Sequence, residues 1–290
     1  MSSCNKFITL SAEHFKGGEY IGPELVTDGE VTITEGLGNI YINRISVGRS
    51  LTILKGVNLT VRGDIIAEGS VITEDGVTAG GSIVSGGMIN VGGSLKVRDL
   101  IVNGDVITRS IMTSGRADIN GNVVVYVDDF INGGGLVVHG SVRCHGHFRS
   151  DKSVEVSGNF IVDRCIKAGL SLSVGGVVIC GGNIDCLWNF IHRKSVTAQN
   201  INVVRAVAGN GDITVIGGII ADELSLLDGG VKASWIICDG SISACFLDIS
   251  GEIRAGVNTN QITDDSICIK ELRSGTIVSG TLHVVQQITR

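Results

Sequence analysis

The sequence predicts an all-β protein, a parallel β-helix in which short strands wind into a triangular solenoid. Three observations support this. Aliphatic residues recur every six positions over most of the 290-residue chain, and a small or branched residue stands two positions after most of them. The chain also contains 42 glycines but only one proline. An α-helix needs a period near 3.6 residues, so a period of six excludes it.

The six-residue period is clearest where it begins, at Leu59. Steps of six from there reach a series of aliphatic residues: Ile65, Val71, Val77, Ile83, Ile89 and Leu95. We continue this phase through Ile101 to Val137, restart it at Val142 and follow it, with small slips, to Ile253. Residues i and i+2 of a strand face the same side. Each hexad is therefore predicted to be a short strand with one large and one small inward side chain.

Three hexads make one coil of about 18 residues, and stacked coils lie about 4.8 Å apart through parallel ladders. The repeat has material for about eleven coils, which would form a stiff rod. Glycine followed by Ser, Asp or Asn recurs between the hexads and is predicted to turn the corners. We expect glycine there because such tight corners require backbone angles that other residues resist.

The pattern divides the chain into three parts. Residues 1–40 do not fit the hexads and are predicted to form an N-terminal cap with a short helix. Residues 41–256 form the parallel β-helix, and residues 257–290 form a C-terminal coil or cap. Caps are expected because a solenoid end exposes unpaired strand edges and the core.

Composition narrows the function. The net charge is −6 with no acidic or basic block, so no nucleic-acid partner is expected. No run of about 18 apolar residues and no signal-peptide pattern occurs, so we expect no membrane span and a cytoplasmic protein, or one assembled in a virion. Eight cysteines without a CxxC pair fit reduced thiols better than a disulfide framework.

The segments LTVRGDIIAEGSV (59–71) and LIVNGDV (100–106) pair an aliphatic step with Gly-Asp or Gly-Ser. In this respect the chain resembles the bactofilins over about residues 50–255. The resemblance implies a triangular right-handed β-helix that polymerises end to end without nucleotide, and a cytoskeletal role. The chain departs from that family in its greater length, its cap-like first segment and its lack of flexible tails containing proline.

Two other interpretations remain. A virion or fibre component would have the same sequence features as a cytoskeletal one. The hexapeptide acyltransferases and sugar-nucleotide transferases also follow a six-residue rule, but their small residue precedes the large one, whereas here it follows. We therefore predict a structural scaffold, not an enzyme, with no cofactor and no catalytic residue.

The only cluster with metal-ligand character contains His139, Cys144, His145 and His147. Zinc needs three or four converging ligands. Cys144 falls in an inward slot while His145 and His147 stand at a corner, so their side chains are predicted to diverge and no metal site is expected. His192 falls in a small inward slot, where we expect a local bulge. In the transferase interpretation it would instead be a base facing a cleft.

The residue after each large aliphatic is predicted to face solvent. On one flat face these outward residues are mostly apolar: Ile66, Val84, Val102, Asn120 and Val138. A second face carries Ile161 and Ile179 in succession. Exposed apolar stripes mark interfaces, so we predict contact with other copies or with another structural protein. The alternative is that a terminal segment of the chain covers the stripe.

Overall fold

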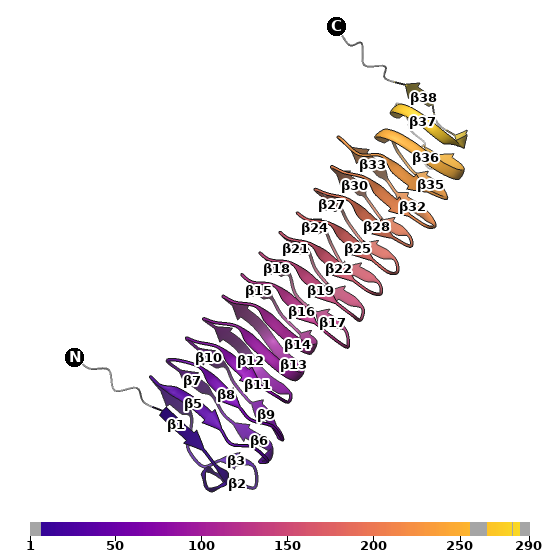
Figure 1. The fold of residues 1–290 in the computed structure, drawn as a ribbon. Coiled ribbons are helices and arrows are strands. Elements are labelled where there is room, and N and C mark those ends of the chain that lie inside the picture. The colour runs from indigo at the N-terminus through magenta and orange to yellow at the C-terminus, as the bar shows by residue number, and fades with distance from the viewer. Residues whose placement is uncertain (1–6, 256–265, 280, 285–290) are drawn as a thin grey trace, which may run out of the picture. The chain divides into compact units, whose positions relative to one another are not determined.

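A computed structural model describes residues 7–255, 266–279 and 281–284. These residues form all-β parallel solenoid structure, about 13 turns in total, which confirms the predicted fold class (Figure 1). The single helical element in the described ranges is a 3-10 turn, η1 (Ala12–His14). None of the described residues forms a helix that is long and apolar enough to cross a membrane. The chain divides into two compact units, Met1–Gly146 and His147–Arg290.

In unit 1 three columns of strands, which we call faces 1 to 3, enclose the core. Face 1 consists of β1 (Phe7–Leu10), β5 (Glu30–Ile33), β8 (Leu51–Ile53), β11 (Val71–Thr73), β16 (Val123–Val125), β19 (Val142–Cys144) and the first parts of β13 (Ile89–Val102) and β14 (Val106–Thr113). Face 2 consists of β2 (Phe15–Lys16), β3 (Glu19–Tyr20), β6 (Gly38–Ile42), β9 (Val57–Val61), β17 (Phe130–Asn132) and parts of β12 (Val77–Ser85), β13 and β14. Face 3 consists of β4 (Leu25–Thr27), β7 (Ile45–Val47), β10 (Ile65–Ala67), β15 (Ala117–Ile119), β18 (Leu136–Val138) and the ends of β12 and β13.

Unit 2 has the same construction, again with three faces. Face 1 consists of β20 (Phe148–Ser150), β23 (Ile166–Ala168), β26 (Ile184–Cys186), β29 (Ile201–Val203), β32 (Gly218–Ala221) and β35 (Trp235–Cys238). Face 2 consists of β21 (Val154–Val156), β24 (Leu172–Val174), β27 (Phe190–His192), β30 (Ala206–Gly209) and β33 (Glu223–Leu226). Face 3 consists of β22 (Phe160–Val162), β25 (Val178–Cys180), β28 (Val196–Ala198), β31 (Ile213–Val215) and β34 (Val231–Ala233). β36 (Ile242–Arg254), β37 (Ser266–Ser279) and β38 (Thr281–Val284) follow, each paired in parallel with the one before it.

The parallel ladders begin earlier than residue 41. β1, β4 and β5 already pair with strands of the next coil, although they lie in the segment assigned to the cap. The predicted short helix is only η1, and a small antiparallel hairpin, β2–β3, follows it. Its two-residue turn is Gly17-Gly18, and both glycines have a positive φ, as such hairpin turns require. Residue 256, several residues before β37 and the last residues lie outside the described ranges.

Every three-residue strand except β4 points its first and third side chains inward, as the hexads predict. The first position is filled by large residues with essentially no exposure, such as Leu172 and Phe160. The rings of Phe148 and Phe160 pack edge to face with centroids 4.7 Å apart. Burying each such side chain stabilises the fold by about 1.5–3 kcal/mol relative to exposing it.

The third position of each strand lies beside a corner, and polar residues there donate to corner carbonyls. Thr108 donates to the carbonyl oxygens of Gly93 at 2.9 Å and Ser110 at 3.1 Å. The Cys180 thiol donates likewise to those of Arg164 and Asn183, at 3.0 and 3.4 Å. Serine, threonine and cysteine therefore suit this slot because they are small and also carry a donor.

Glycine stands at the corners for a different reason from the one predicted. In the described residues a positive φ occurs at only a few glycines, namely Gly17, Gly18, Gly36, Gly38, Gly56 and Gly211. At Gly86 and Gly181 the backbone angles are ordinary, but a Cβ atom would overlap the carbonyl oxygen of Glu68 or Asp163 one coil below. The close approach of successive coils, not the backbone angle, therefore requires glycine at most corners.

Aspartate and asparagine before a strand join that coil to the next. The Asp105 carboxylate accepts the backbone N–H of Asn122 at 2.7 Å, and the Asn200 side-chain oxygen accepts that of Gly218 at 3.0 Å. In both cases the residue that donates this N–H group follows a glycine. A Cβ atom on that glycine would overlap the accepting side chain, and Asn200 lies where a Gly217 Cβ would be. The Gly-Asp and Gly-Asn pairs of the sequence are thus contacts between coils.

This contact can be tested by substitution of Gly217. Gly217→Ala should lower the free energy of unfolding by about 1–3 kcal/mol through overpacking. Asn200→Ala should lower it through loss of its hydrogen bonds. The overlap caused by Gly217→Ala involves the Asn200 side chain and is absent when that side chain is removed. The double variant should therefore lose about 0.5–3 kcal/mol less unfolding free energy than the two single variants lose together. Denaturant titration measures all three values.

The matched control is Gly76→Ala, because a Cβ atom there lies no closer than 3.3 Å to any neighbouring coil. That variant should keep wild-type stability within about 0.5 kcal/mol. Additive effects at Gly217 and Asn200 would show that the side-chain overlap is not what requires glycine.

Candidate interaction surface

The predicted apolar stripe exists on face 3 of unit 1, but with partly different residues. Ile66 pairs with Val84, and Val84 pairs with Ile101, so three aliphatic side chains stand directly above one another and point outward. Ile66 and Val84 are half-buried and Ile101 is 47% exposed. We call these three residues the Ile66 stripe. The next outward residue on this face is Asp118, which ends the stripe.

Val102 and Val138, also predicted to face outward, point into the core instead. Their exposed fractions are 1% and 0%. The cause is a corner one residue shorter than the hexad rule. Ile65 pairs with Ile83, eighteen residues on, whereas Ile83 pairs with Leu100, seventeen residues on. From that corner to Leu136 the first inward residue of each strand therefore lies one or two residues before the predicted one. Where the difference is two residues, as at Ile119 and Val125, the predicted residue still faces inward, in the third position of its strand.

The sequence contains a signal for this short corner that the periodicity did not use. Leu100, Ile101 and Val102 are all aliphatic, so hydropathy alone does not decide which of them face inward. Asp99, however, accepts the backbone N–H of Arg116 at 3.0 Å, as other aspartates that directly precede an inward residue do. An aspartate at that place therefore identifies Leu100 as inward and Ile101 as the exposed residue.

In unit 2, Ile161 and Ile179 are outward neighbours on face 3, as predicted. Ile179 is exposed and Ile161 is half-buried. Their column then turns polar, with Thr197, Thr214 and Lys232 above them. That they form an interface remains a prediction.

Sequence reasoning missed a second apolar column on face 1 of unit 1. Its outward residues are Ile72, Ile107 and Val124, with Asn90 between the first two. Ile72 is exposed, and the other two aliphatic side chains are half-buried. The shifted phase hid Ile107, which the predicted phase placed inside, and Val124, which that phase placed just before an inward Val125. Ile72 follows the inward Val71, as the hexads predict, but was not joined to a column.

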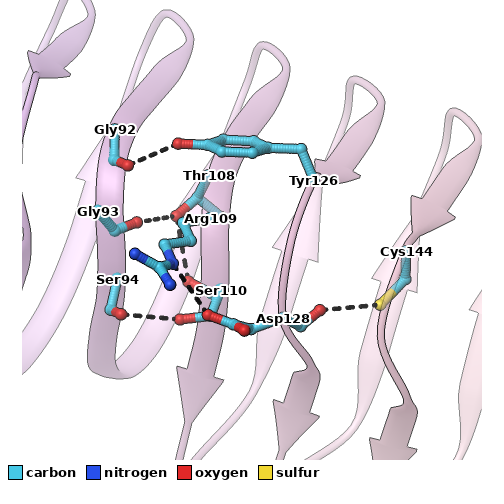
Figure 2. A network of polar contacts seen from close by, with 9 residues as sticks. All are labelled: Gly92, Gly93, Ser94, Thr108, Arg109, Ser110, Tyr126, Asp128 and Cys144. Atoms are coloured by element: carbon cyan, nitrogen blue, oxygen red, sulfur yellow. Dashed lines mark hydrogen bonds and ion pairs between the residues drawn. The ribbon is translucent and has the colours of Figure 1, made fainter.

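Figure 2 shows a polar network at the corner between faces 1 and 2 of unit 1. Arg109 forms an ion pair with Asp128 at 3.1 Å, and the Ser110 hydroxyl donates to that of Ser94 at 2.9 Å. The Tyr126 hydroxyl donates to the Gly92 carbonyl oxygen at 2.5 Å, and so reaches past the coil that carries Arg109. Each of these three contacts joins different coils, so the network holds the corner together.

A polar hollow of about 380 Å³ adjoins this network. Thr60, Thr78, Lys96 and Arg109 line it together with Glu74 and its neighbours. Arg109 is engaged by Asp128. The hollow combines hydroxyl groups with the Lys96 ammonium group and the carboxylates of Glu74 and Asp75 at an exposed corner, and we assign it no reaction.

The histidines predicted as weak metal candidates do not form a site with their neighbours. His139 and His145 lie in unit 1, while His147 lies in unit 2, where its Nδ1 accepts the backbone N–H of Cys165 at 3.4 Å. Cys144 is buried in its inward slot, as predicted. The described ranges contain no group of three or more His, Cys, Asp or Glu residues able to hold a metal ion.

His192 does not form a bulge, contrary to the prediction. β27 keeps its register with Val174 below and Gly209 above, and the ring lies inside with 1% exposure. Nδ1 lies 2.8 Å from the Lys194 carbonyl oxygen, so Nδ1 carries the proton. The ring fits because the residue above is glycine: a Cβ at Gly209 would overlap His192. An exposed base facing a cleft, as a transferase needs, is not what this geometry provides.

The buried thiols are donors, not nucleophiles. Burial raises the pKa of Cys180 to about 11 and also raises the pKa of Cys186. Reactive cysteines instead have lowered pKa values. Both thiols donate to corner carbonyls, so they serve the packing of the coils.

Comparison of the chain with protein-family models, with characterised proteins and with solved structures finds no match. The functional argument therefore depends on the fold and on the surfaces described above.

The corrected register can be checked with two neighbouring substitutions. Ile101→Lys places a charge on the surface beside Asp118 and should change the free energy of unfolding by less than about 0.5 kcal/mol. Val102→Lys buries an unpaired ammonium group and should lower it by several kcal/mol or prevent folding. Denaturant titration with circular dichroism measures both. If Ile101→Lys lowered the free energy of unfolding more than Val102→Lys, Ile101 would face inward, as the hexad phase predicts.

The buried imidazole should make stability depend on pH. Burial lowers the pKa of His192 below 6.5, while the backbone groups of Lys194 and Asn210 act in the opposite direction. As the pH falls below about 6.5, the unfolded chain binds a proton at this residue and the folded chain does not. The free energy of unfolding should therefore decrease until the pH reaches the folded-state pKa, and stay level below it.

His192→Asn is the matched control, because Asn132 already fills an inward slot in unit 1 and donates to the Gly134 carbonyl oxygen two residues on. That variant should lose the part of the pH dependence that comes from His192, while the other histidines remain. Denaturant titrations at pH 5 to 8 compare the two proteins. Identical pH profiles would contradict a lowered pKa at His192.

Proposed function

We propose that the protein is a nonenzymatic scaffold that docks onto other copies of itself or onto another structural protein through the Ile66 stripe. The parallel solenoid is compatible with a scaffold or with a hexapeptide-repeat protein. The observation that carries the proposal is the column of Ile66, Val84 and Ile101, in which three aliphatic side chains face solvent on one flat face. Apolar surface of this kind is favourable to bury against a partner.

The ends of the solenoid are a second candidate for assembly. β1 pairs with β5 on one side, and no described strand pairs with its other edge. Phe7 on β1 and Val26 on β4 are both largely exposed. An open strand edge with apolar side chains can accept another strand, and this supports the end-to-end polymerisation that the bactofilin resemblance implies. A virion or fibre component would use the same contacts.

The test replaces two residues of the stripe with lysine. Ile66→Lys together with Ile101→Lys should leave the fold intact but reduce the mass measured by multi-angle light scattering, because a charged face no longer gains from burial. Thr78→Lys is the control, since Thr78 is an exposed outward residue on face 2. Unchanged mass in the double variant, at concentrations where the wild type associates, would exclude the stripe as the contact.

A further inference from the structure

The outward residues on face 1 of unit 2 are sorted by chemistry along the column. Paired strands place them directly above one another in this order: Arg149, Lys167, Asp185, Asn202, Ile220 and Ile237. The first two are exposed cations, and the last two are aliphatic. We call these six residues the Lys167 column.

The corner beside this column continues the pattern. Leu187 and Val204 occupy equivalent corner positions in successive coils, since their N–H groups bond the carbonyl oxygens of Ala168 and Cys186. They are 56% and 55% exposed. Asp222 and Asp239 occupy the corners of the next two coils. A groove of about 360 Å³ between the corner and the column is lined by these residues with Asp185 and Ile220, and by no lysine or arginine.

The corner at the upper end of this surface is negative, while Arg254, the next outward residue above Ile237, is paired with Glu252 at 2.6 Å. The Asp222 carboxylate makes no hydrogen bond or ion pair with the residues that the structure describes. Burial raises the pKa of the neighbouring Cys238 thiol to about 12, and the charges of Asp239, Asp222 and Glu223 act in the same direction. A cation placed in the groove would therefore be attracted to this end.

The lower end is positive and open to contact. Lys167 is exposed and forms no ion pair within the described ranges. Arg149 pairs with Asp151 at 3.0 Å, but both side chains are more than half exposed, so the pair contributes little stability. Both cations at this end are therefore available to a partner.

The positive lower end and the negative upper end of this surface are complementary to those of a second copy that faces it in the antiparallel orientation. If two copies meet face to face about a two-fold axis between the Asp185 and Asn202 coils, Lys167 of one copy lies opposite Ile220 and Asp222 of the other. Leu187 lies opposite Val204 at the centre. A two-fold axis along the column would instead place Lys167 opposite Lys167 and carry the two Asp222 corners to opposite sides of the contact. Only the antiparallel arrangement pairs Lys167 with Asp222 and buries the aliphatic centre. It also places Asp239 opposite Asp151, whose charge Arg149 balances within the same copy.

We propose that the Lys167 column and its corner form an antiparallel, two-fold symmetric contact with a second copy of this chain. The six coils of the column span roughly 24 Å at about 4.8 Å per coil, which places the buried area at the low end of specific interfaces. The contact is therefore weak and transient on its own. It lies wholly in unit 2 and does not depend on the Ile66 stripe of unit 1.

The test uses charge reversal at one pair. Lys167→Glu alone and Asp222→Lys alone each place like charges opposite one another twice in the symmetric dimer, so each should weaken self-association by more than about tenfold at low salt. An equimolar mixture of the two variants should recover association, because in the mixed dimer both contacts between positions 167 and 222 again join one acidic and one basic side chain. Sedimentation velocity at several concentrations and two ionic strengths measures this.

Lys232→Glu is the control, since Lys232 is an exposed outward residue on face 3 of unit 2 and should leave association unchanged. Three results would overturn the proposal: a wild type that stays monomeric at high concentration, single variants that associate like the wild type, or a mixture that does not recover. If Ile66→Lys with Ile101→Lys abolishes association while the charge reversals do not, the stripe is the contact and the Lys167 column is not. If the charge reversals abolish association while Ile66→Lys with Ile101→Lys does not, the Lys167 column is the contact and the stripe is not.

Discussion

The close approach of successive coils at their corners is the constraint on which the rest of the structure depends. Ladder hydrogen bonds set the distance between coils, so a corner residue lies almost directly above its equivalent one coil below. At Gly92 a Cβ atom would overlap the Glu74 carbonyl oxygen, and at Gly115 it would overlap the Asp99 carboxylate. Glycine and a preceding-coil Asp or Asn therefore form one unit of packing. This unit repeats along the chain, whatever the outward residues are.

This construction leaves little of each strand for function. Two of its three side chains fill the core, and polar ones in the third position, such as Thr108 and Cys180, are engaged by corner carbonyls. The single outward residue of each strand and the corners remain free to vary. A functional surface on such a fold is therefore expected to be a column of single residues from successive coils, and the proposed contact at the Ile66 stripe has this form. Its chemistry is set over distances of 17 to 20 residues, as the pairings of Ile83 with Leu100 and Ile45 with Ile65 show.

The fold class was predictable because a period of six with paired inward slots survives substitution among aliphatic residues. The phase was not, because Leu100, Ile101 and Val102 satisfy hydropathy in either register. An error of one residue exchanges inside and outside, so Val102 and Val138 were assigned to the surface and Ile107 to the core. His192 was misassigned for another reason. Its place inside depends on Gly209 one coil above, and a pattern read strand by strand does not consider that neighbour. The charge order of the Lys167 column is likewise visible only once the pairing of strands is known.

The two proposed contacts differ in their physical chemistry, and this gives each a distinct response to solution conditions. The Ile66 stripe gains from removing aliphatic surface from water, so salts that are excluded from protein surfaces strengthen it. The Lys167 column gains from matched charges at exposed positions, which added salt screens within about 10 Å at 0.1 M. Assembly that strengthens with sulfate therefore reports the stripe, and assembly that weakens with simple salt reports the column. If both contacts act in one assembly, each raises the effective concentration for the other, so two weak surfaces suffice for a stable scaffold.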